Sequence, residues 1–443
     1  MQILIDNGIV IAGDRVIKGG SVLIEDNRIL RVGDSNEVKK DVVEAEKIDA
    51  SGKLVLPGFV NTHTHISMTL LRGYADDYPL QEWLNNWIWP IEAKLKPEDI
   101  ELGAYLGALE SIMMGVTTVC TLYHYHPDKN EASGILKAGI RGVVGIALFT
   151  WEKDKCIKNV KDALARWHGK NGLIRIAVGP HAPYTVDPDL WVEASELRKW
   201  GDEKYGEKGR VIITTHVAED PNEAKITSQR FRVEIPGNAM FKYLDKLGVL
   251  DEYFLAAHAI HITSEDINII KQRGVKISHN PISNMKLGMG ISPIHKLLSN
   301  GIHVSLGTDG PASNNTLDII ETMKIATLLQ KVLTGDPTVI PAKTAFKMAT
   351  EFGAEALHMP YIGRICEEYL ADIVIIDLHK PHLTPMYDPF SHIVYSMRSL
   401  DVNTVIVDGK ILFRDRMFTN VNFDEIMVKV NKAVERLIGD IEW

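Results

Sequence analysis

The stretch VLPGFVNTHTHIS, residues 55–67, places two histidines at the end of an apolar, β-branched run. Residues i and i+2 of a β-strand point to the same face, so His63 and His65 are expected to lie side by side. Such a pair suits one half of a metal site, because imidazole nitrogen is a common zinc ligand. It suits equally well two polar residues at a strand end, so the pair alone leaves both interpretations open.

The run that ends in this pair is the first of a series, and helix-like segments separate its members. Near-continuous apolar strands that alternate with helices are typical of parallel strands buried on both faces. Eight such units predict a (β/α)8 TIM barrel, an α/β fold, over residues 57–362. The eight runs cover residues 54–61, 117–122, 141–148, 173–179, 210–216, 254–259, 276–280 and 303–309.

The two ends of the chain have a different pattern. Residues 1–53 and 364–414 read as strands and tight turns without long helices, and a final helix is predicted over 423–438. We expect residues 1–56 and 363–443 to combine into one small β-sandwich beside the barrel, with the terminal helix added. Two separate β-rich flaps are the alternative.

The composition excludes several classes of protein. The 443-residue chain has a formal charge of −9 and no Lys/Arg run, which argues against a nucleic-acid partner or an anionic membrane surface. No apolar stretch reaches the roughly 20 residues that a membrane span needs. The three cysteines form no CxxC pair, which excludes a cytidine-deaminase type of zinc site and favours a reducing, cytoplasmic setting.

Polar residues recur where the predicted strands end. The carboxyl ends of barrel strands meet at one face, so these side chains should gather there. Three imidazoles and one carboxylate suit a divalent metal with room for a water, whereas a hydrogen-bonded polar rim is the alternative. The residues are His63 and His65, His181, His216, Glu219, His258 with His261, His279 and Asp309.

Some of these residues carry a more specific expectation. Glu219 follows His216 by three positions, which fits a proton shuttle, although a solvated loop acid has the same pattern. His258 lies closer to its strand end than His261 and is the one expected to enter the site. His279 is expected to contact the substrate or to support the site from behind. The remaining histidines, His124 among them, are expected to be surface or packing residues.

Five motifs together resemble the amidohydrolase superfamily, and within it the 5'-methylthioadenosine/S-adenosylhomocysteine deaminases. Guanine deaminase and the triazine hydrolases are similar members of the same branch, so another aminohydrolase is the alternative function. A non-catalytic binding protein on this fold is a further alternative, which the complete set of polar residues argues against. The motifs are VLPGFVNTHTHIS, GPHAPYT, the His216/Glu219 pair, SHNPISNMKLGMGISP and VSLGTDGPASNN.

The resemblance implies roles for individual residues. It implies one divalent metal per subunit, with zinc expected and Fe²⁺ or Mn²⁺ also suited to the same ligands. The implied metal ligands are His63, His65, His216 and Asp309. In the implied hydrolytic deamination, Asp309 takes a proton from water, His258 orients the water and Glu219 protonates the purine ring. The implied substrate contacts are Glu92 at the ribose, His181, Glu219, Trp83 in the loop after strand 1, and His279.

One departure from the family pattern affects the substrate. Some members carry an arginine after strand 3 that meets the amino-acid tail of the substrate, but here the segment reads ALFTWEKDKCIKN, with Lys153 and Lys155. A flexible ammonium does not replace the bidentate grip of a guanidinium on a carboxylate. A neutral 5' group, as in methylthioadenosine or deoxyadenosine, is therefore expected to suit the pocket at least as well. Arg230 and Arg232 are expected in an exposed charged segment, and a dimer or tetramer is expected from family habit.

Overall fold

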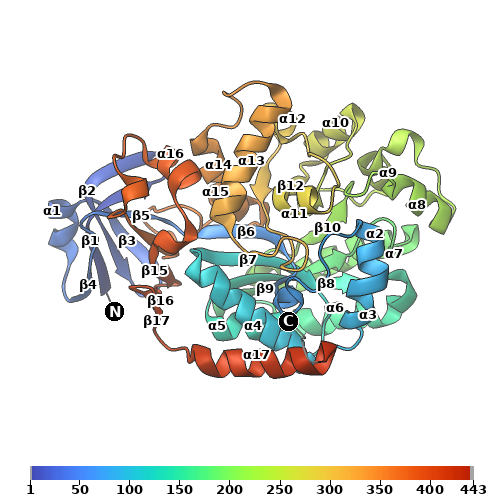
Figure 1. Cartoon of the computed structure of the whole chain (residues 1–443), viewed down its shortest axis with the longest axis horizontal. Coiled ribbons are helices and arrows are strands. Elements are labelled where there is room, and N and C mark those ends of the chain that lie inside the picture. Colours follow the sequence, from blue (N-terminus) through green and yellow to red (C-terminus); the bar gives the residue numbers. More distant parts are fainter. Residues whose placement is uncertain (1, 440–443) are drawn as a thin grey trace.

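The computed structural model describes residues 2–439 and contains two separate sheets, a barrel and a mixed sheet beside it (Figure 1). Every neighbouring pair of barrel strands is parallel and follows the order of the chain. The (β/α)8 fold is therefore confirmed. The barrel strands are β6 (Phe59–Thr64), β7 (Val116–Tyr123), β8 (Arg141–Leu148), β9 (Ile174–Pro180), β10 (Ile213–Val217), β11 (Phe254–His258), β12 (Lys276–His279) and β13 (Val304–Leu306).

The barrel closes because the last strand returns to the first. The backbone N–H of Asp309 donates to the carbonyl of His63 at 3.0 Å, and the hydroxyl of Thr62 donates to the carbonyl of Leu306 at 2.9 Å. Every residue of β7 and β8 is buried, as expected for strands covered on both faces. This closure brings the chain around His63 against the chain around Asp309.

The helices of the barrel begin and end where local sequence chemistry directs them. Thr263 caps α10 in a reciprocal capping box with Asp266, and Gly274 follows with a left-handed φ of 69°. The helices, with short helical turns, are η2 (Ile66–Leu71), α2 (Leu80–Glu82), η3 (Trp83–Ile88), α3 (Trp89–Glu92), α4 (Pro97–Met113), α5 (Glu131–Ala138), η4 (Thr150–Glu152), α6 (Lys153–Trp167), η5 (Lys170–Gly172), α7 (Pro188–Tyr205), η6 (Gly206–Lys208), α8 (Glu223–Phe231), η7 (Pro236–Asn238), α9 (Met240–Lys246), α10 (Ser264–Arg273), α11 (Pro281–Lys286), α12 (Ile294–Ser299), α13 (Ile319–Thr334), α14 (Ala342–Met348) and α15 (Glu351–Ala356).

Both ends of the chain contribute to the second sheet, which has nine strands. β5 pairs in parallel with β1 and antiparallel with β14, so the N-terminal and C-terminal segments join directly at this pair. The two ends therefore form one β unit rather than two flaps. Its strands are β1 (Gln2–Ala12), β2 (Arg15–Glu25), β3 (Arg28–Asp34), β4 (Ala45–Asp49), β5 (Lys53–Pro57), β14 (Ile373–Asp377), β15 (Val402–Val407), β16 (Lys410–Arg414) and β17 (Met417–Phe418).

The predicted first barrel strand, 54–61, is divided between the two sheets. β5 ends at Pro57 in the mixed sheet, β6 begins at Phe59 in the barrel, and Gly58 lies between them. A Cβ atom at Gly58 would lie 2.1 Å from the hydroxyl oxygen of Thr117, so only glycine fits where the chain passes from one sheet to the other. An apolar run shows that both segments are buried but cannot show that they belong to different sheets.

The remaining helices connect the β unit or cover the barrel. The predicted final helix is α17 (Phe423–Ile438), which crosses back over the barrel and packs against α4 (Figure 1). No helix within residues 2–439 is long and apolar enough to span a bilayer. The other short elements are α1 (Ser35–Val38), η1 (Lys39–Asp41), η8 (Pro381–Leu383), α16 (Pro389–Ser391), η9 (His392–Ser396) and η10 (Ser399–Asp401).

A buried ion pair connects the two sheets. The guanidinium of Arg141, on β8, donates to both carboxylate oxygens of Asp372 at 2.7 and 3.0 Å and to Asp408 at 2.8 Å. The side chains of Arg141 and Asp372 are each 1% exposed. Removing one partner of such a pair leaves the other charge buried and uncompensated.

We expect Arg141→Met to lower the free energy of unfolding by about 3–5 kcal/mol, measured by urea denaturation, because it leaves the Asp372 carboxylate buried without a compensating charge. Arg414→Met is the matched control, since its ion pair with Glu46 is partly exposed and its loss should cost less than about 1 kcal/mol. Equal losses in the two variants would contradict this role of the buried pair.

Candidate active site

The residues predicted at strand ends converge at one end of the barrel. β6 carries His63 and is followed at once by His65, while β10 carries His216 and β11 ends in His258. Asp309 lies three residues beyond the end of β13, in a loop rather than in the predicted strand. The backbone bond from Asp309 to His63 places this loop against β6.

The centre of the site consists of imidazoles and one carboxylate. The Nε2 atom of His65 lies 3.2 Å from Oδ1 of Asp309 and 3.2 Å from Nε2 of His216. Nitrogen or oxygen atoms of His63, His216, His258 and Asp309 also all lie within 4.8 Å of one another. The four residues predicted as ligands therefore lie together. His258 is a fifth side chain at the same point, although its predicted role was to orient the water rather than to bind the metal.

The orientation of the imidazoles is set by acceptors on the far side of each ring. Nδ1–H of His65 donates to the carbonyl of Leu122 at 2.6 Å, and Nδ1–H of His216 donates to the carbonyl of His181 at 2.6 Å. A proton held on Nδ1 leaves the Nε2 lone pair free to coordinate a metal. These backbone bonds direct both Nε2 atoms toward the centre.

Asp309 is fixed in the same manner. Its Oδ2 atom accepts hydrogen bonds from the hydroxyls of Ser283 at 2.6 Å and Ser313 at 2.9 Å, which leaves Oδ1 facing the imidazoles. Burial by itself raises the pKa of Asp309, but the imidazoles of His63 and His65 outweigh it and hold the pKa well below its ordinary value. Asp309 is thus a carboxylate at neutral pH, as a metal ligand must be.

The donor set fits a divalent cation. Within residues 2–439, Nε2 of His63, Nε2 of His258 and Oδ1 of Asp309 are buried and have no hydrogen-bond partner. Buried polar atoms are normally paired, so unpaired atoms that converge on one point indicate a ligand. Nitrogen and carboxylate oxygen are donors that zinc and similar divalent ions accept.

Glu219 lies beside this centre, in the loop after β10. Its Oε1 atom is 3.6 Å from Nε2 of His258, and its side chain is 6% exposed. Burial, and then the nearby carboxylate of Asp309, raise the pKa of Glu219 well above its ordinary value. The group can therefore carry a proton at neutral pH and release it to a neighbouring base.

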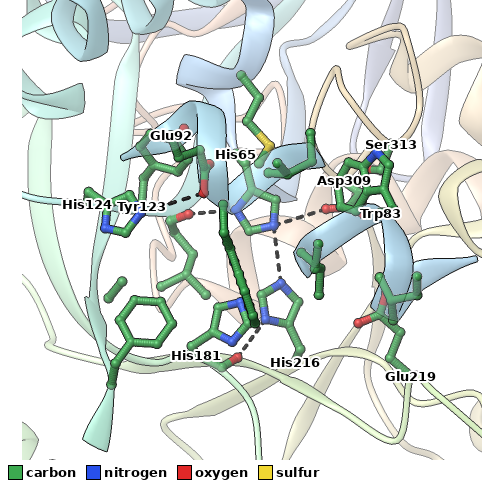
Figure 2. Close-up of a pocket in the computed structure, with 18 of the residues that line it drawn as sticks. His65, Trp83, Glu92, Tyr123, His124, His181, His216, Glu219, Asp309 and Ser313 are labelled. Atoms are coloured by element: carbon green, nitrogen blue, oxygen red, sulfur yellow. Dashed lines mark hydrogen bonds and ion pairs between the residues drawn. The ribbon is translucent and has the colours of Figure 1, made fainter. Parts of the chain in front are cut away.

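A cavity leads from this centre to the surface, and Figure 2 shows its lining. Trp83, Glu92 and His181 line it, as predicted, together with His65, His216, Glu219 and Asp309. Trp83 and Glu92 lie on the helical segment η3–α3 that covers the mouth of the barrel. His181 is held by a 3.0 Å contact between its Nδ1 atom and the hydroxyl of Thr185.

His279 does not line the cavity within residues 2–439, so its expected contact with the substrate stays a prediction. It is fully buried at the end of β12. Two later residues of the same SHNPISN motif serve the site instead. Ser283 bonds to Asp309, and Asn284 accepts the Nδ1–H of His258 at 2.7 Å. Both lie on α11, which begins two residues after β12 ends and therefore stays close to the centre of the site.

His124 was expected to be a surface or packing residue; it is exposed, but it also belongs to the cavity wall. It follows β7 directly and lines the cavity, with its Nε2 atom 3.7 Å from Oε2 of Glu92 (Figure 2). Burial alone lowers the pKa of His124, but the Glu92 carboxylate overcomes this and raises it. The sequence could have indicated this role, because His124 directly follows a predicted barrel strand and functional side chains gather at the carboxyl ends of such strands.

A second, wider hollow of about 550 Å³ adjoins the cavity and shares Glu92, His124 and Phe149 with it. Lys155 lines this hollow, but its ammonium is already paired with Glu152 at 2.9 Å. Arg230 is exposed, as predicted, and its guanidinium lies over the ring of Trp151, 5.4 Å from the centroid. Trp151 also lines the hollow.

Comparison with known proteins gives consistent matches over most of the chain. The model of the amidohydrolase family matches residues 54–412. A 5-methylthioadenosine/S-adenosylhomocysteine deaminase from Thermococcus kodakarensis is 46% identical over 93% of this chain and 94% of its own. A 5'-deoxyadenosine deaminase from Methanothermobacter thermautotrophicus is 42% identical over 96% of each chain.

A solved structure agrees with these matches. The crystal structure of an adenosine deaminase from Xanthomonas campestris with bound zinc superposes with a TM-score of 0.91. It is 28% identical and covers 98% of both chains. The two proteins therefore share one fold over nearly their whole length.

We expect His216→Ala to reduce the bound divalent metal from about one equivalent to below about 0.2 after gentle purification, because it removes a ligand from a small donor set. Elemental analysis of the purified protein measures this. His261→Ala is the control, since the Nε2 atom of His261 contacts the carbonyl of Met289 outside the centre. Full metal retention in His216→Ala would show that the convergence of these rings has another purpose.

Proposed function

The chain belongs to the amidohydrolase family, and from this premise we propose that it hydrolyses the amino group of an adenosine-type nucleoside, releasing ammonia and the inosine analogue. One observation carries the proposal. A buried carboxyl group with a raised pKa, Glu219, shares a cavity with a carboxylate and imidazoles suited to a divalent metal. Deamination needs both elements, since water must be activated and the ring and leaving group must be protonated.

The proposed ligands are His63, His65, His216 and Asp309, and the proposed ion is zinc. The zinc in the Xanthomonas campestris relative supports this choice. When bound, the ion would lower the pKa of a water and so supply a nucleophile at neutral pH. His258 also reaches the centre, but its Nε2 atom lies 3.6 Å from Glu219, which favours a role in orienting the water.

The proton steps are assigned to residues of the chain. Asp309 receives a proton from the attacking water, because it is ionised and its Oδ1 atom faces the centre while the serine hydroxyls occupy Oδ2. Glu219 gives a proton to the purine ring nitrogen beside the carbon under attack. That carbon then becomes more electrophilic. Asp309 then passes its proton to the amino group, so that the C–N bond breaks and ammonia leaves. The hydroxyl proton of the intermediate returns to Glu219 as the product carbonyl forms.

The nucleoside end of the substrate is assigned to the opposite side of the cavity. Glu92 would accept hydrogen bonds from the ribose hydroxyls, with its carboxylate held beside His124 at 3.7 Å. Its Oε1 atom is buried and has no partner within residues 2–439, so it is available to a ligand. His181 and Trp83 line the wall around the base.

The hollow beyond Glu92 bears on the 5' substituent. Its lining includes Leu95, Tyr125, Phe149 and Trp151, which suit an apolar group. The ammonium of Lys155 is neutralised by Glu152 and is a weak partner for a carboxylate. We therefore assign a neutral 5' group, as in methylthioadenosine or deoxyadenosine, as the preferred substituent.

A substrate panel tests the reaction. Adenosine, 5'-deoxyadenosine, methylthioadenosine, S-adenosylhomocysteine, guanine and melamine are offered, and ammonia release is followed. The neutral 5' nucleosides should exceed S-adenosylhomocysteine by about tenfold in kcat/KM, since the bidentate arginine contact is lacking. Release from guanine or melamine alone would overturn the proposal in favour of another aminohydrolase.

The ribose contact is tested by Glu92→Gln. Hydrogen bonds to a charged group contribute about 1.5–3 kcal/mol, so kcat/KM for nucleosides should fall about 10–100-fold. Glu98→Gln is the control, because Glu98 is a surface acid paired with Lys129 outside the cavity. An unchanged KM for adenosine analogues in Glu92→Gln would remove the ribose role from this residue.

A further inference from the structure

Glu223 is a buried acidic side chain that the proposed reaction does not use. It is the first residue of α8 and is 1% exposed. One of its oxygens accepts the backbone N–H of Ala218 at 2.9 Å, and the other accepts the backbone N–H of Glu219 at 3.0 Å. The side chain therefore binds the turn that carries Glu219, through both of its oxygens.

The turn needs such a support. Ala218 has a φ of 56°, in the left-handed region that side-chain-bearing residues rarely adopt. This conformation persists only where the surroundings enforce it. The carbonyl of Ala218 accepts the N–H groups of Ile260 and His261 at 2.9 and 3.0 Å. Glu223 holds the N–H side of the same residue, so the turn is fixed from both sides.

We propose that Glu223 is a positioning residue: by holding the N–H groups of Ala218 and Glu219, it sets the direction in which the Glu219 carboxyl enters the cavity. Glu223 itself does not line the cavity described by residues 2–439. The inference rests on the proposed proton transfer by Glu219. Because a displacement of about 1 Å at a reacting group can cost about 100-fold in rate, a small rotation of this turn has a large effect.

A second buried acidic side chain offers a matched comparison. Glu131 is the first residue of α5, is 1% exposed, and accepts the N–H of Ser67 at 3.1 Å and the hydroxyl of Thr121 at 2.7 Å. It has the same place in its helix and the same burial as Glu223. Its contacts are Ser67, just after His65, and Thr121 on β7, not the turn of Glu219, so the two acidic side chains differ in what they hold.

The test begins with Glu223→Gln in the full-length protein saturated with zinc. The amide keeps one acceptor oxygen but turns an NH₂ group toward the second backbone N–H, which destabilises the turn. We expect kcat to fall about 10–100-fold while KM stays within about threefold, and bound metal to stay near one equivalent. Glu223→Asp keeps both acceptor oxygens on a shorter side chain and should recover part of the loss.

A double-mutant cycle separates positioning from general stability. If Glu223 acts through Glu219, then Glu219→Gln/Glu223→Gln should be no slower than Glu219→Gln alone. Glu219→Gln/Glu131→Gln should instead be slower than either single variant, because Glu131 acts on another loop. Wild-type kcat in Glu223→Gln, or multiplicative losses in the first pair, would overturn the inference.

A crystal structure of the Glu223→Gln variant would test the inference without any substrate. The carboxyl group of Glu219 should be displaced by about 1 Å or more from its wild-type position. An unmoved Glu219 would overturn the inference even if the panel of substrates confirms the deaminase. A displaced Glu219 together with a failed nucleoside panel would overturn the proposed function and leave this inference standing.

Discussion

The hydrogen bond between the backbone N–H of Asp309 and the carbonyl of His63 closes the barrel and creates the site. These residues are far apart in sequence, and neither could form a metal centre with its own neighbours. Once the last strand returns to the first, a carboxylate and two imidazoles share one small volume. The ion pairs and hydrogen bonds of these three side chains, and the cavity that they line, all depend on this closure.

The site is rigid because each functional side chain is held at its far end. Leu122 and His181 accept the Nδ1 protons of His65 and His216. Ser283 and Ser313 occupy one oxygen of Asp309. These contacts leave Nε2 of His65, Nε2 of His216 and Oδ1 of Asp309 facing one another in a buried environment, which is costly for the isolated protein. The cost is offset when a ligand or metal completes the set.

The prediction was most accurate for side chains at the carboxyl ends of the predicted barrel strands. His63, His65, His216, His258 and Asp309 could be found from their spacing because a parallel barrel brings all strand ends to one face. The same rule would have included His124, which follows β7, but it could not find Ser283 or Asn284. Each of these two acts through one contact with a residue distant in sequence, and no local pattern separates such a serine or asparagine from a solvent-exposed one.

The sequence by itself determined the strand and helix pattern and the kinds of donor available, whereas the joining of the two chain ends became certain only from the pairing of β5 with β1 and β14. Periodicity and residue chemistry are local properties, so they can be read along the chain. The tertiary structure alone decided that residues 54–61 divide between two sheets, that His279 lies away from the cavity while His124 faces Glu92, and that Glu223 holds the turn of Glu219. These outcomes depend on where a backbone passes and which atom faces which. Such contacts arise only when distant segments pack together.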